Sequence, residues 1–435
     1  MKTTTLLLLL TFLSLTADGA ADTGADATAS SSRLTLNGVI RVVRERNPAI
    51  REAVRKWEAA KERVRQEGAW DDLKVGGTSK VRRYVDVPPE SFTDQMLAIE
   101  QTIPITGKNL VRARIASAEA VNAFEAVRRQ ELDTVAKART AYFRLGNALA
   151  QIELNKRNYT SLSQIAEISR SRYEVGTDNA ADVLMAETEA AKLLEMRRDL
   201  ERNVATAQSQ LNVLMNRDAF MQIGTPVDIA AMDAHLNANS LRAVTLENQP
   251  EVRAARARAA AEQARLQLAR RAWIPDPAVK IEGQRYNDAA RDLSELDAGI
   301  SFTVPWVNAG KYSAAVREAN ANIEAARAGL ERSQSEAIGA LRDALQKVET
   351  AHHHVELFRD KLVPQARQTF EASQLAYESG KATFRDWIAA QRTVRDLETE
   401  AREHLTDYQT ALAELESVVG ADLHVFPTTT TQPNK

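Results

Sequence analysis

The sequence predicts a mainly α-helical protein with a small β part, in which one set of helices and strands occurs twice. Three observations lead to this prediction: a repeated phrase, a regular apolar period in the longest segments, and four short runs of alternating character. The repeated phrase is YEVGTDNAADVLMAE at Tyr173–Glu187, and it recurs as YESGKATFRDWIAAQ at Tyr377–Gln391. A phrase that recurs across half of a chain indicates a duplicated structural unit.

Matching residues upstream of the repeated phrase set the bounds of the two units. We expect one repeat over residues 34–217 and a second over residues 240–423, with a connector at 218–239 between them. Each repeat contains a motif in which a predicted strand leads into a predicted helix: EQTIPITGK in the first and SFTVPWVNAGK in the second. These strand-to-helix junctions place the same residue types at matching positions: Pro104, Gly107 and Lys108, then Pro305, Gly310 and Lys311.

Both repeats are predicted to contain the same elements in the same order. A helical stretch of about 35 residues comes first, followed by two strands, one long helix, a turn and a shorter return helix. The strands are expected at 73–84, 95–104, 278–287 and 296–305, the long helices at 108–173 and 311–376, and the return helices at 180–216 and 383–419.

The long helices have a coiled-coil period. In the second repeat, Ala337, Leu341, Ala344 and Val348 alternate spacings of four and three residues, which is typical of left-handed coiled-coil packing. A continuous helix over 108–173 would be about 100 Å long at about 1.5 Å per residue. This length excludes a compact domain and predicts a rod or a tube. Pro364 lies within the second long helix and predicts a kink there.

The strand-like runs alternate between apolar and hydrophilic residues. In the last run, Ile300 and Phe302 fall on one face, while Ser301 and Thr303 fall on the other. This pattern is typical of a transmembrane β-strand with lipid on one side and water on the other. Soluble strands with one buried face would show the same alternation. Four strands cannot close a barrel, and hydrocarbon does not tolerate open sheet edges, so the membrane interpretation requires several copies of the chain.

The N-terminus predicts export. One lysine precedes a short apolar run and then several small residues, which is the pattern of a cleaved signal peptide over residues 1–21. We expect a flexible linker at 22–33 and a disordered tail at 424–435, because both are polar and low in complexity. The chain has no cysteine, so the exported protein is expected to carry no lipid attachment.

Several classes of function are excluded by composition and by missing motifs. The net charge is −2, with both signs interleaved, and this argues against nucleic acid as a partner. No set of catalytic residues and no dinucleotide or phosphate fingerprint is present, so we expect neither an enzyme nor a bound cofactor. His352, His353 and His354 are consecutive and lack the i, i+4 spacing with which one helix usually binds a metal. We therefore expect these histidines on a solvated face and no metal site.

Taken together, the paired Asn/Gln-Pro helices, the strand pairs that end in Pro and Gly-Lys, and the two Y-x-x-G…D turns resemble the TolC-type outer-membrane efflux family. The resemblance covers nearly all of the mature chain. It implies a homotrimer in outer-membrane lipid that forms a twelve-stranded β-barrel, continued by an α-helical barrel across the periplasm of a Gram-negative-type cell.

The resemblance also implies partners and a role. Such a channel docks through a periplasmic adaptor, a membrane fusion protein, onto an inner-membrane pump, and an RND-type pump is favoured. The QTIPITGK junction is most similar to the branch that exports heavy metals and drugs, so metal ions or small toxic compounds are the expected substrates. There are two alternatives. One is a conduit for type I protein or peptide secretion, and the other is an exported coiled-coil scaffold with no pore.

In this family the two repeated phrases would form hairpin tips at the end that faces the pump. Gly176 and Gly380 suit the left-handed residue that follows a helix end. Tyr173 and Tyr377 lie one turn earlier and are expected to pack against the neighbouring hairpin. Thr177 or Asp178 in the first repeat, and Thr383 in the second, are expected to cap the return helices. Glu174, Lys381 and Arg385 are candidate contacts for the adaptor.

Asp182 and Asp386 fall in the first turn of the return helices and allow two interpretations. They would interact favourably with the helix dipole there. Alternatively, they would form acidic rings that line the aperture and act as a gate. The family's second acidic residue, three positions later, is replaced here by Met185 and Ala389, which weakens the gate interpretation.

Overall fold

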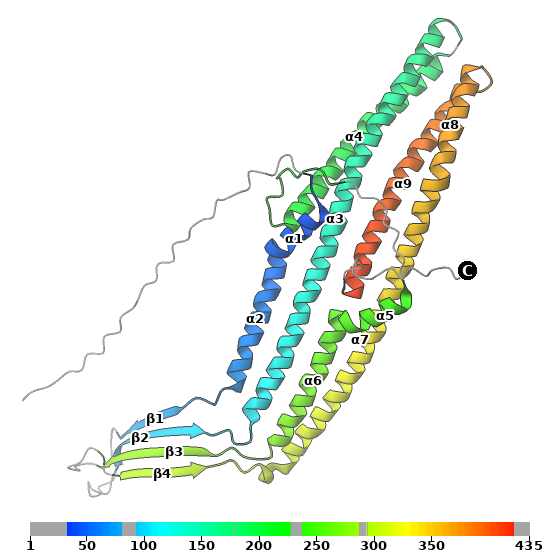
Figure 1. Cartoon of the computed structure of the whole chain (residues 1–435). Helices are drawn as coiled ribbons and strands as arrows, with labels where there is room; N and C mark the ends of the chain where they lie inside the picture. The colour runs from blue at the N-terminus through cyan, green and yellow to red at the C-terminus, as the bar shows by residue number, and fades with distance from the viewer. Residues whose placement is uncertain are drawn as a thin grey trace, which may run out of the picture.

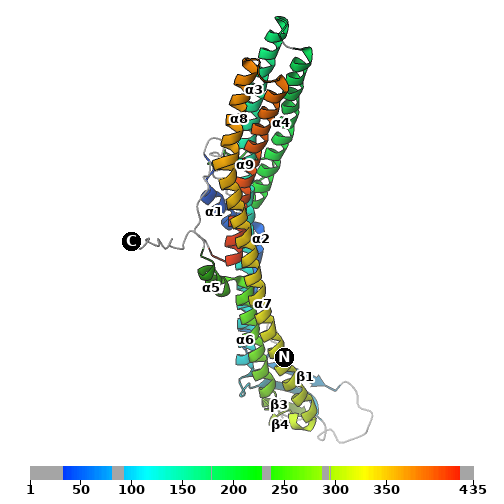
Figure 2. The same ribbon diagram turned by 90° about the vertical axis from the view of Figure 1, so that its right-hand side faces the viewer.

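The computed structural model describes residues 33–80, 93–177, 179–227, 237–286, 293 and 295–421. The predicted signal peptide, the predicted tail and most of the predicted linker lie outside the described residues. The protein is elongated, with a small sheet at one end and two helical hairpin turns at the other (Figure 1). The view from the side shows how narrow the helical part is (Figure 2). The predicted fold class, mainly α with a small β part and two repeats, is confirmed.

The leading helical stretch of each repeat is divided into two helices at a proline. The helices are α1 (Leu36–Arg46) and α2 (Pro48–Gly68) in the first repeat, and α5 (Ala238–Asn248) and α6 (Pro250–Arg271) in the second. A residue that precedes proline is pushed out of the helical region, and Asn47 has the extended angles φ −65° and ψ 125°. Its side chain then caps the next helix, since Oδ1 accepts a hydrogen bond of 2.9 Å from the Ala49 N–H. The predicted helical stretch is therefore present in each repeat, but it consists of two helices and not of one.

The long helices form the body of the molecule. The first hairpin consists of α3 (Lys108–Glu174) and α4 (Ala180–Leu214). The second consists of α7 (Ala309–Leu357), a π-helical turn (Phe358–Leu362), α8 (Val363–Glu378) and α9 (Phe384–Val419). The predicted seam is confirmed, because Leu341, Ala344 and Val348 pack in one buried cluster with Leu415 of α9.

The π-helical turn explains the irregular offset between the repeats. Lys108 and Lys311 are 203 positions apart at the start of the long helices, whereas Tyr173 and Tyr377 are 204 positions apart at their ends. A π turn accommodates one extra residue in a helix without rotating the segments on either side. It ends at Leu362, two residues before Pro364, whose ring would clash with a carbonyl in a regular α-helix. The structure therefore places a π turn next to Pro364, and the predicted kink stays a prediction.

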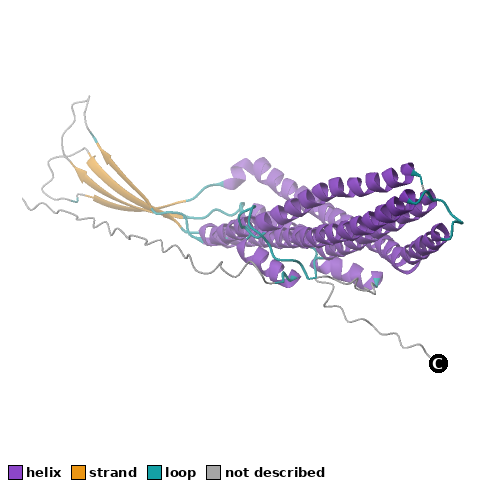
Figure 3. Cartoon of the chain, turned by 90° about the horizontal axis from the view of Figure 1, so that it is seen from above, coloured by secondary structure: helices purple, strands orange, loops and turns teal. Residues whose placement is uncertain are grey.

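The sheet connects the two repeats. Its strands are β1 (Lys74–Ser79), β2 (Thr93–Thr102), β3 (Ala278–Tyr286) and β4 (Glu295–Ser301), antiparallel and in the order β1-β2-β3-β4. The sheet extends away from the helices (Figure 3). One row of paired residues is apolar across all four strands: Val75, Ile99, Ile281 and Ala298. The three larger members of this row are exposed, so the apolar face is uncovered in the single chain.

The helical part is held together by three buried clusters along its length. One joins α1, α3 and α4, a second joins α5, α7 and α9, and a third joins both hairpins near their turns. Small residues such as Ala138 and Ala141 allow the helices to approach closely. Among the described residues, none of the helices combines the length and the apolar character needed to cross a bilayer.

Candidate functional site

Both hairpin turns have the glycine geometry that the sequence predicts. Gly176 has φ +76° and Gly380 has φ +72°, in the left-handed region that favours glycine. The Gly176 N–H donates to the Tyr173 carbonyl at 2.9 Å, and the Gly380 N–H donates to the Tyr377 carbonyl at 3.0 Å. The two repeats therefore reverse direction with the same backbone structure.

The return helices begin with different caps. In the second repeat Thr383 is the N-cap, as predicted, and it forms a capping box with Asp386. The Asp386 carboxylate accepts hydrogen bonds from the Thr383 N–H at 3.0 Å and from the Thr383 hydroxyl at 2.7 Å. In the first repeat the N-cap is Asn179, so the prediction of Thr177 or Asp178 was wrong. Thr177 instead donates to a carbonyl of the preceding helix, and Asp178 lies outside the described residues.

The two candidate gate residues differ in their partners. Asp386 is hydrogen-bonded to Thr383, the N-cap residue of α9. The hydrogen bond from the Thr383 side chain holds the pKa of the Asp386 carboxyl below the usual value. Asp182 lies in the first turn of α4 and is half-buried. Both positions suit the helix-dipole interpretation. Their role at an aperture remains a prediction. The candidate adaptor contacts Glu174, Lys381 and Arg385 are exposed.

The two tyrosines of the repeated phrase have different surroundings. Tyr377 is 4% exposed and stacks on Trp387, with 5.0 Å between the ring centroids. The Arg172 guanidinium, which belongs to the other hairpin, lies 4.7 Å from the centre of the Tyr377 ring. Tyr173 is 49% exposed in the single chain. Tyr377 therefore packs against the neighbouring hairpin, as expected, while the same expectation for Tyr173 stays a prediction.

A buried carboxylate ties the hairpins together near their turns, and the sequence analysis did not identify it. Glu189 of α4 is 3% exposed. Its Oε1 is 2.7 Å from both the Lys192 ammonium and the Arg392 guanidinium of α9, and its Oε2 is 3.7 Å from Arg395. Burial opposes ionisation, but the hydrogen bonds from Lys192 and Arg392 outweigh it and hold the pKa of Glu189 below its usual value.

A pattern in the sequence could have revealed this glutamate. Ala186, Ala190 and Leu193 line the apolar seam of α4, and Glu189 falls within that stripe. A charged residue on an apolar helix face requires a partner. The equivalent position in the second repeat, offset by 204 residues, is Thr393. The duplication therefore gives no hint of this ionic contact.

The other end of the long helices contains a polar junction between the repeats. Lys108, at the start of α3, lies 3.0 Å from Asp276, which precedes β3. The same carboxylate accepts hydrogen bonds from the Thr106 N–H at 3.0 Å and from the Thr106 hydroxyl at 2.7 Å. Arg271 donates to the carbonyls of Thr106 and Gly107. Burial opposes ionisation of Asp276. The hydrogen bonds from Thr106 and Lys108 and the charge of Lys108 outweigh it and hold the pKa of the Asp276 carboxyl below the usual value.

The predicted junction residues are placed at this end, with unequal roles. Gly107 has φ +63° and precedes α3, and Pro104 lies two residues beyond β2. In the second repeat, Pro305 is buried at the start of a 3₁₀ turn, and β4 ends at Ser301, four residues before the expected end of the strand. Gly310 and Lys311 are exposed in the single chain. Asp276 was not predicted, although Asp-Pro in a turn next to a strand is a signal for a side chain that binds backbone N–H groups.

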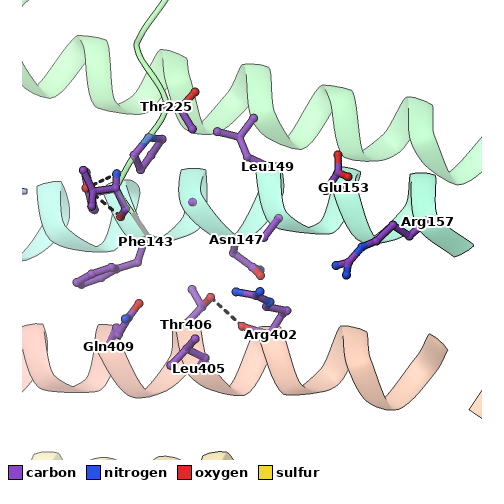
Figure 4. Close-up of a pocket in the computed structure, with 15 residues that line it drawn as sticks. Phe143, Asn147, Leu149, Glu153, Arg157, Thr225, Arg402, Leu405, Thr406 and Gln409 are labelled. Carbon is purple, nitrogen blue, oxygen red and sulfur yellow. Dashed lines mark hydrogen bonds between the residues drawn. The ribbon is translucent and has the colours of Figure 1, made fainter. Parts of the chain in front are cut away.

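A cavity of about 330 Å³ lies between α3, α9 and the connector (Figure 4). Its wall is partly aromatic, because Tyr142 and Phe143 of α3 contribute to it. The Tyr142 hydroxyl donates to the Leu34 carbonyl at 2.8 Å and accepts from the Val227 N–H at 3.2 Å. These bonds attach the described part of the connector to the long helix. Glu153, Arg157 and Arg402 line the cavity as well.

The histidines are only partly on a solvated face. His353 is exposed, but His354 packs against His404 of α9, with 4.8 Å between the ring centroids, and His352 packs against Tyr408 at 5.3 Å. The expectation that all three face solvent was therefore wrong, because the seam between α7 and α9 is wide enough to include His352 and His354. Within the described part of the chain, no group of three His, Cys, Asp or Glu side chains could hold a metal ion.

Comparisons with known proteins identify the family. The structure of the outer-membrane protein VceC from Vibrio cholerae superimposes with a TM-score of 0.74 at 18% identity, covering 89% of this chain and 96% of that one. The duplicated hairpins and the sheet are therefore the fold of an outer-membrane protein of this type. The model of the outer membrane efflux protein family matches residues 39–217 and 241–421. The chain belongs to this family, as its resemblance to TolC-type proteins predicts.

Two relatives are similar in sequence over most of their length. The cobalt-zinc-cadmium resistance protein CzcC of Cupriavidus metallidurans is 22% identical over 347 residues, which are 77% of this chain and 79% of the relative. The probable efflux pump outer membrane protein SepC of Pseudomonas putida is 24% identical over 331 residues, which are 73% of this chain and 68% of the relative. The chain is thus an outer-membrane efflux protein.

Proposed function

We propose that this protein is the outer-membrane channel of a tripartite efflux system and gives substrates a passive exit. The observation that supports it is the combination of two long hairpins with a sheet that has one uncovered apolar face. Three copies would supply twelve strands for a barrel in lipid, and the hairpins would continue the duct into the periplasm. The free energy for transport would come from the partner pump. The chain would reach the outer membrane through a cleaved signal peptide, without lipid attachment and without enzyme activity.

The proposed partners are a periplasmic adaptor and an inner-membrane pump, with an RND-type pump favoured. The adaptor would bind the hairpin turns, where Glu174, Lys381 and Arg385 are exposed. Contact with the adaptor would shift the hairpins from a closed to an open arrangement. Metal ions or small toxic compounds are the proposed substrates, and the similarity to a cobalt-zinc-cadmium resistance protein supports the first class.

Site-specific photocrosslinking in intact cells tests the docking proposal. A photoreactive residue at Lys381, on the exposed turn, is expected to capture a periplasmic adaptor. The control carries the photoreactive residue in place of Arg41, which is exposed on α1, and is expected to capture no adaptor. If Lys381 captures no adaptor in a well-expressed oligomer, the docking proposal fails and a scaffold without a pore gains support. Capture of an adaptor that belongs to an ATP-driven secretion pump would favour the type I alternative.

The substrate class is tested by growth. Loss of the gene is expected to sensitise the cells to cobalt, zinc or cadmium salts, or to small toxic compounds, with restoration by the wild-type chain. Unchanged tolerance to both classes, together with loss of a secreted polypeptide, would contradict the proposed substrates.

A further inference from the structure

Four histidines gather at one contact between two helices of the second hairpin. Three of them are consecutive at the end of α7, and the fourth lies on α9, which packs against α7. The chain has six histidines, and the other two lie outside the described residues. Such a concentration of one side-chain type indicates a shared role. The four residues are His352, His353, His354 and His404.

The first repeat has no counterpart to this cluster. The repeats are offset by 203 positions before the π turn, so His354 corresponds to Gln151. They are offset by 204 positions after it, so His404 corresponds to Leu200. A leucine binds no metal, and transition metals prefer imidazole and thiolate ligands to amides. The packing of two such helices therefore does not require imidazoles at these positions.

The register of α7 against α9 brings two of the imidazole rings together. Three successive contacts define this register, and from one to the next the residue number rises along α7 and falls along α9. They are Lys347 with Glu414, His352 with Tyr408, and His354 with His404. The last contact puts the centres of two imidazole rings 4.8 Å apart, with their planes inclined at 53°. Antiparallel helix packing thus holds the two rings close together on different helices.

The distance between the two rings suits a metal ion held between them. Zinc–nitrogen bonds are about 2.0–2.1 Å long and the ligands of a tetrahedral ion diverge by about 109°, so the centres of two bound imidazoles are about 5 Å apart. The rings of His354 and His404 already have this spacing. We propose that His354 and His404 bind a divalent transition-metal ion between α7 and α9.

The chemistry of the pair defines the class of ion. Neutral imidazole suits zinc, copper, cobalt and nickel, whereas magnesium and calcium prefer oxygen ligands. In the described part of the chain, no third His, Cys, Asp or Glu completes a set of ligands with them. The remaining coordination positions are therefore left to water. A structural zinc site has four protein ligands, so an ion held by two is exchangeable and follows the metal concentration around it.

The ion would join the two helices beside the π turn. His354 lies in the last turn of α7, and Phe358, the first residue of the π turn, packs against His404 with 4.6 Å between the ring centroids. π turns within α-helices are frequent at functional sites. A metal ion bound here stabilises the contact by mass action, since it binds the packed helices and not the separated ones. The inference goes beyond the proposed function, because a passive exit does not require a metal ion bound to its helices.

Zinc titration of the purified protein, prepared without a histidine tag, tests the proposal. Calorimetry at a pH above neutrality is suitable, because protons then do not compete for the imidazole nitrogens. We expect saturable binding of one Zn²⁺ per chain that excess Mg²⁺ does not displace. With zinc at about 100 times its dissociation constant, amide hydrogen exchange around the pair is expected to be about 100-fold slower than without zinc.

Substitutions borrowed from repeat 1 remove the ligands with little change in packing. His354→Gln and His404→Leu introduce the residues that occupy the equivalent positions in α3 and α4, and each is expected to abolish zinc binding. The matched control is His353→Ala, because His353 is exposed on the same helical turn. His352→Ala is a second control, because His352 lies 3.6 Å from Glu356 and tests a site formed by α7 alone. Both controls are expected to bind zinc as the wild type does.

The pattern of zinc binding across the variants decides between the outcomes. Loss of binding in both ligand variants, with both controls unchanged and with zinc-free exchange as in the wild type, supports the site. Absence of saturable binding in the wild type overturns the proposal. Binding that survives His404→Leu also overturns it, because the ion is then held without α9. None of these measurements involves an adaptor, a pump or transport, so a failure here leaves the proposed function standing.

Discussion

Replacement of Glu189 tests whether the two hairpins of one chain are held together near their turns. The side chain of Glu189 is 5% exposed, and it is the only acidic partner recorded for the Arg392 guanidinium in the described residues. Removal of one member of a buried ion pair costs about 3–5 kcal/mol. Arg392 is 44% exposed and regains water when the carboxylate is lost, so we expect Glu189→Gln to cost about 2 kcal/mol.

The assay is amide hydrogen exchange of the purified protein. A loss of about 2 kcal/mol in the local opening free energy corresponds to exchange that is about 30-fold faster. The increase is expected in the cluster that joins both hairpins, which includes Ile165, Leu193, Tyr377 and Trp387. Helices near the sheet are expected to exchange as in the wild type.

A matched control is available two residues earlier in the same helix. Glu187 pairs with Arg170, but both side chains are about half exposed. An exposed pair contributes about 0.5 kcal/mol, so Glu187→Gln is expected to change exchange about two-fold. If Glu189→Gln changes exchange no more than this control, then the hairpins are held by apolar packing alone and the reasoning is refuted.

Three further predictions follow from the caps, the junction and the π turn. Thr383→Ala removes the N-cap of α9 and is expected to cost about 1 kcal/mol of stability, with most of it restored by Thr383→Ser; no loss on denaturation would contradict the capping role. Asp276→Asn is expected to lower the thermal midpoint at neutral pH. The pKa of Asp276 is lower in the folded protein than its unfolded value of about 3.9. The difference in thermal midpoint between wild type and variant should therefore be full above about pH 3.9 and vanish as the pH falls through the folded pKa. A difference that stays constant with pH would contradict the role of the ionised carboxylate. Deletion of Lys361 combined with Pro364→Ala should convert the π turn to α-helix with little loss of stability. Deletion of Lys156 in the uninterrupted α3 should cost about 3 kcal/mol or more, because it rotates one half of a buried seam. Equal thermal midpoints for the two deletions would refute the assignment of the extra residue.

The sequence was sufficient to predict the architecture because the architecture depends on periodic signals. The seam at Leu341, Ala344 and Val348 and the glycines at both turns are local patterns, and each determines its own element. The positions of the helix breaks were less accessible. Asn47-Pro48 belongs to the Asn/Gln-Pro motif that supports the family resemblance, and its effect on the backbone, an extended residue before proline, predicts two helices.

The ionic contacts could not be predicted from the same signals, because they depend on which helices become neighbours. Glu189 and Arg392 are 203 positions apart in the chain, and neither lies in a recognisable motif. Lys108 was identified as a conspicuous junction residue, but its partner Asp276 lies in the other repeat. Helix periodicity specifies the buried face of a helix and leaves open which partner covers it.

The duplication itself explains why equivalent residues have different surroundings in the single chain. Repeat 1 contacts repeat 2 through β2 and β3 and through α3 with α6 and α9, and these contacts are complete in one chain. The equivalent contacts of repeat 2, along β4 and α7, would require a following repeat 1. Lys108 is therefore paired within the chain, while the equivalent Lys311 is exposed. An internal repeat thus gives one chain two halves of the same construction, and faces that are covered in repeat 1 are exposed in repeat 2.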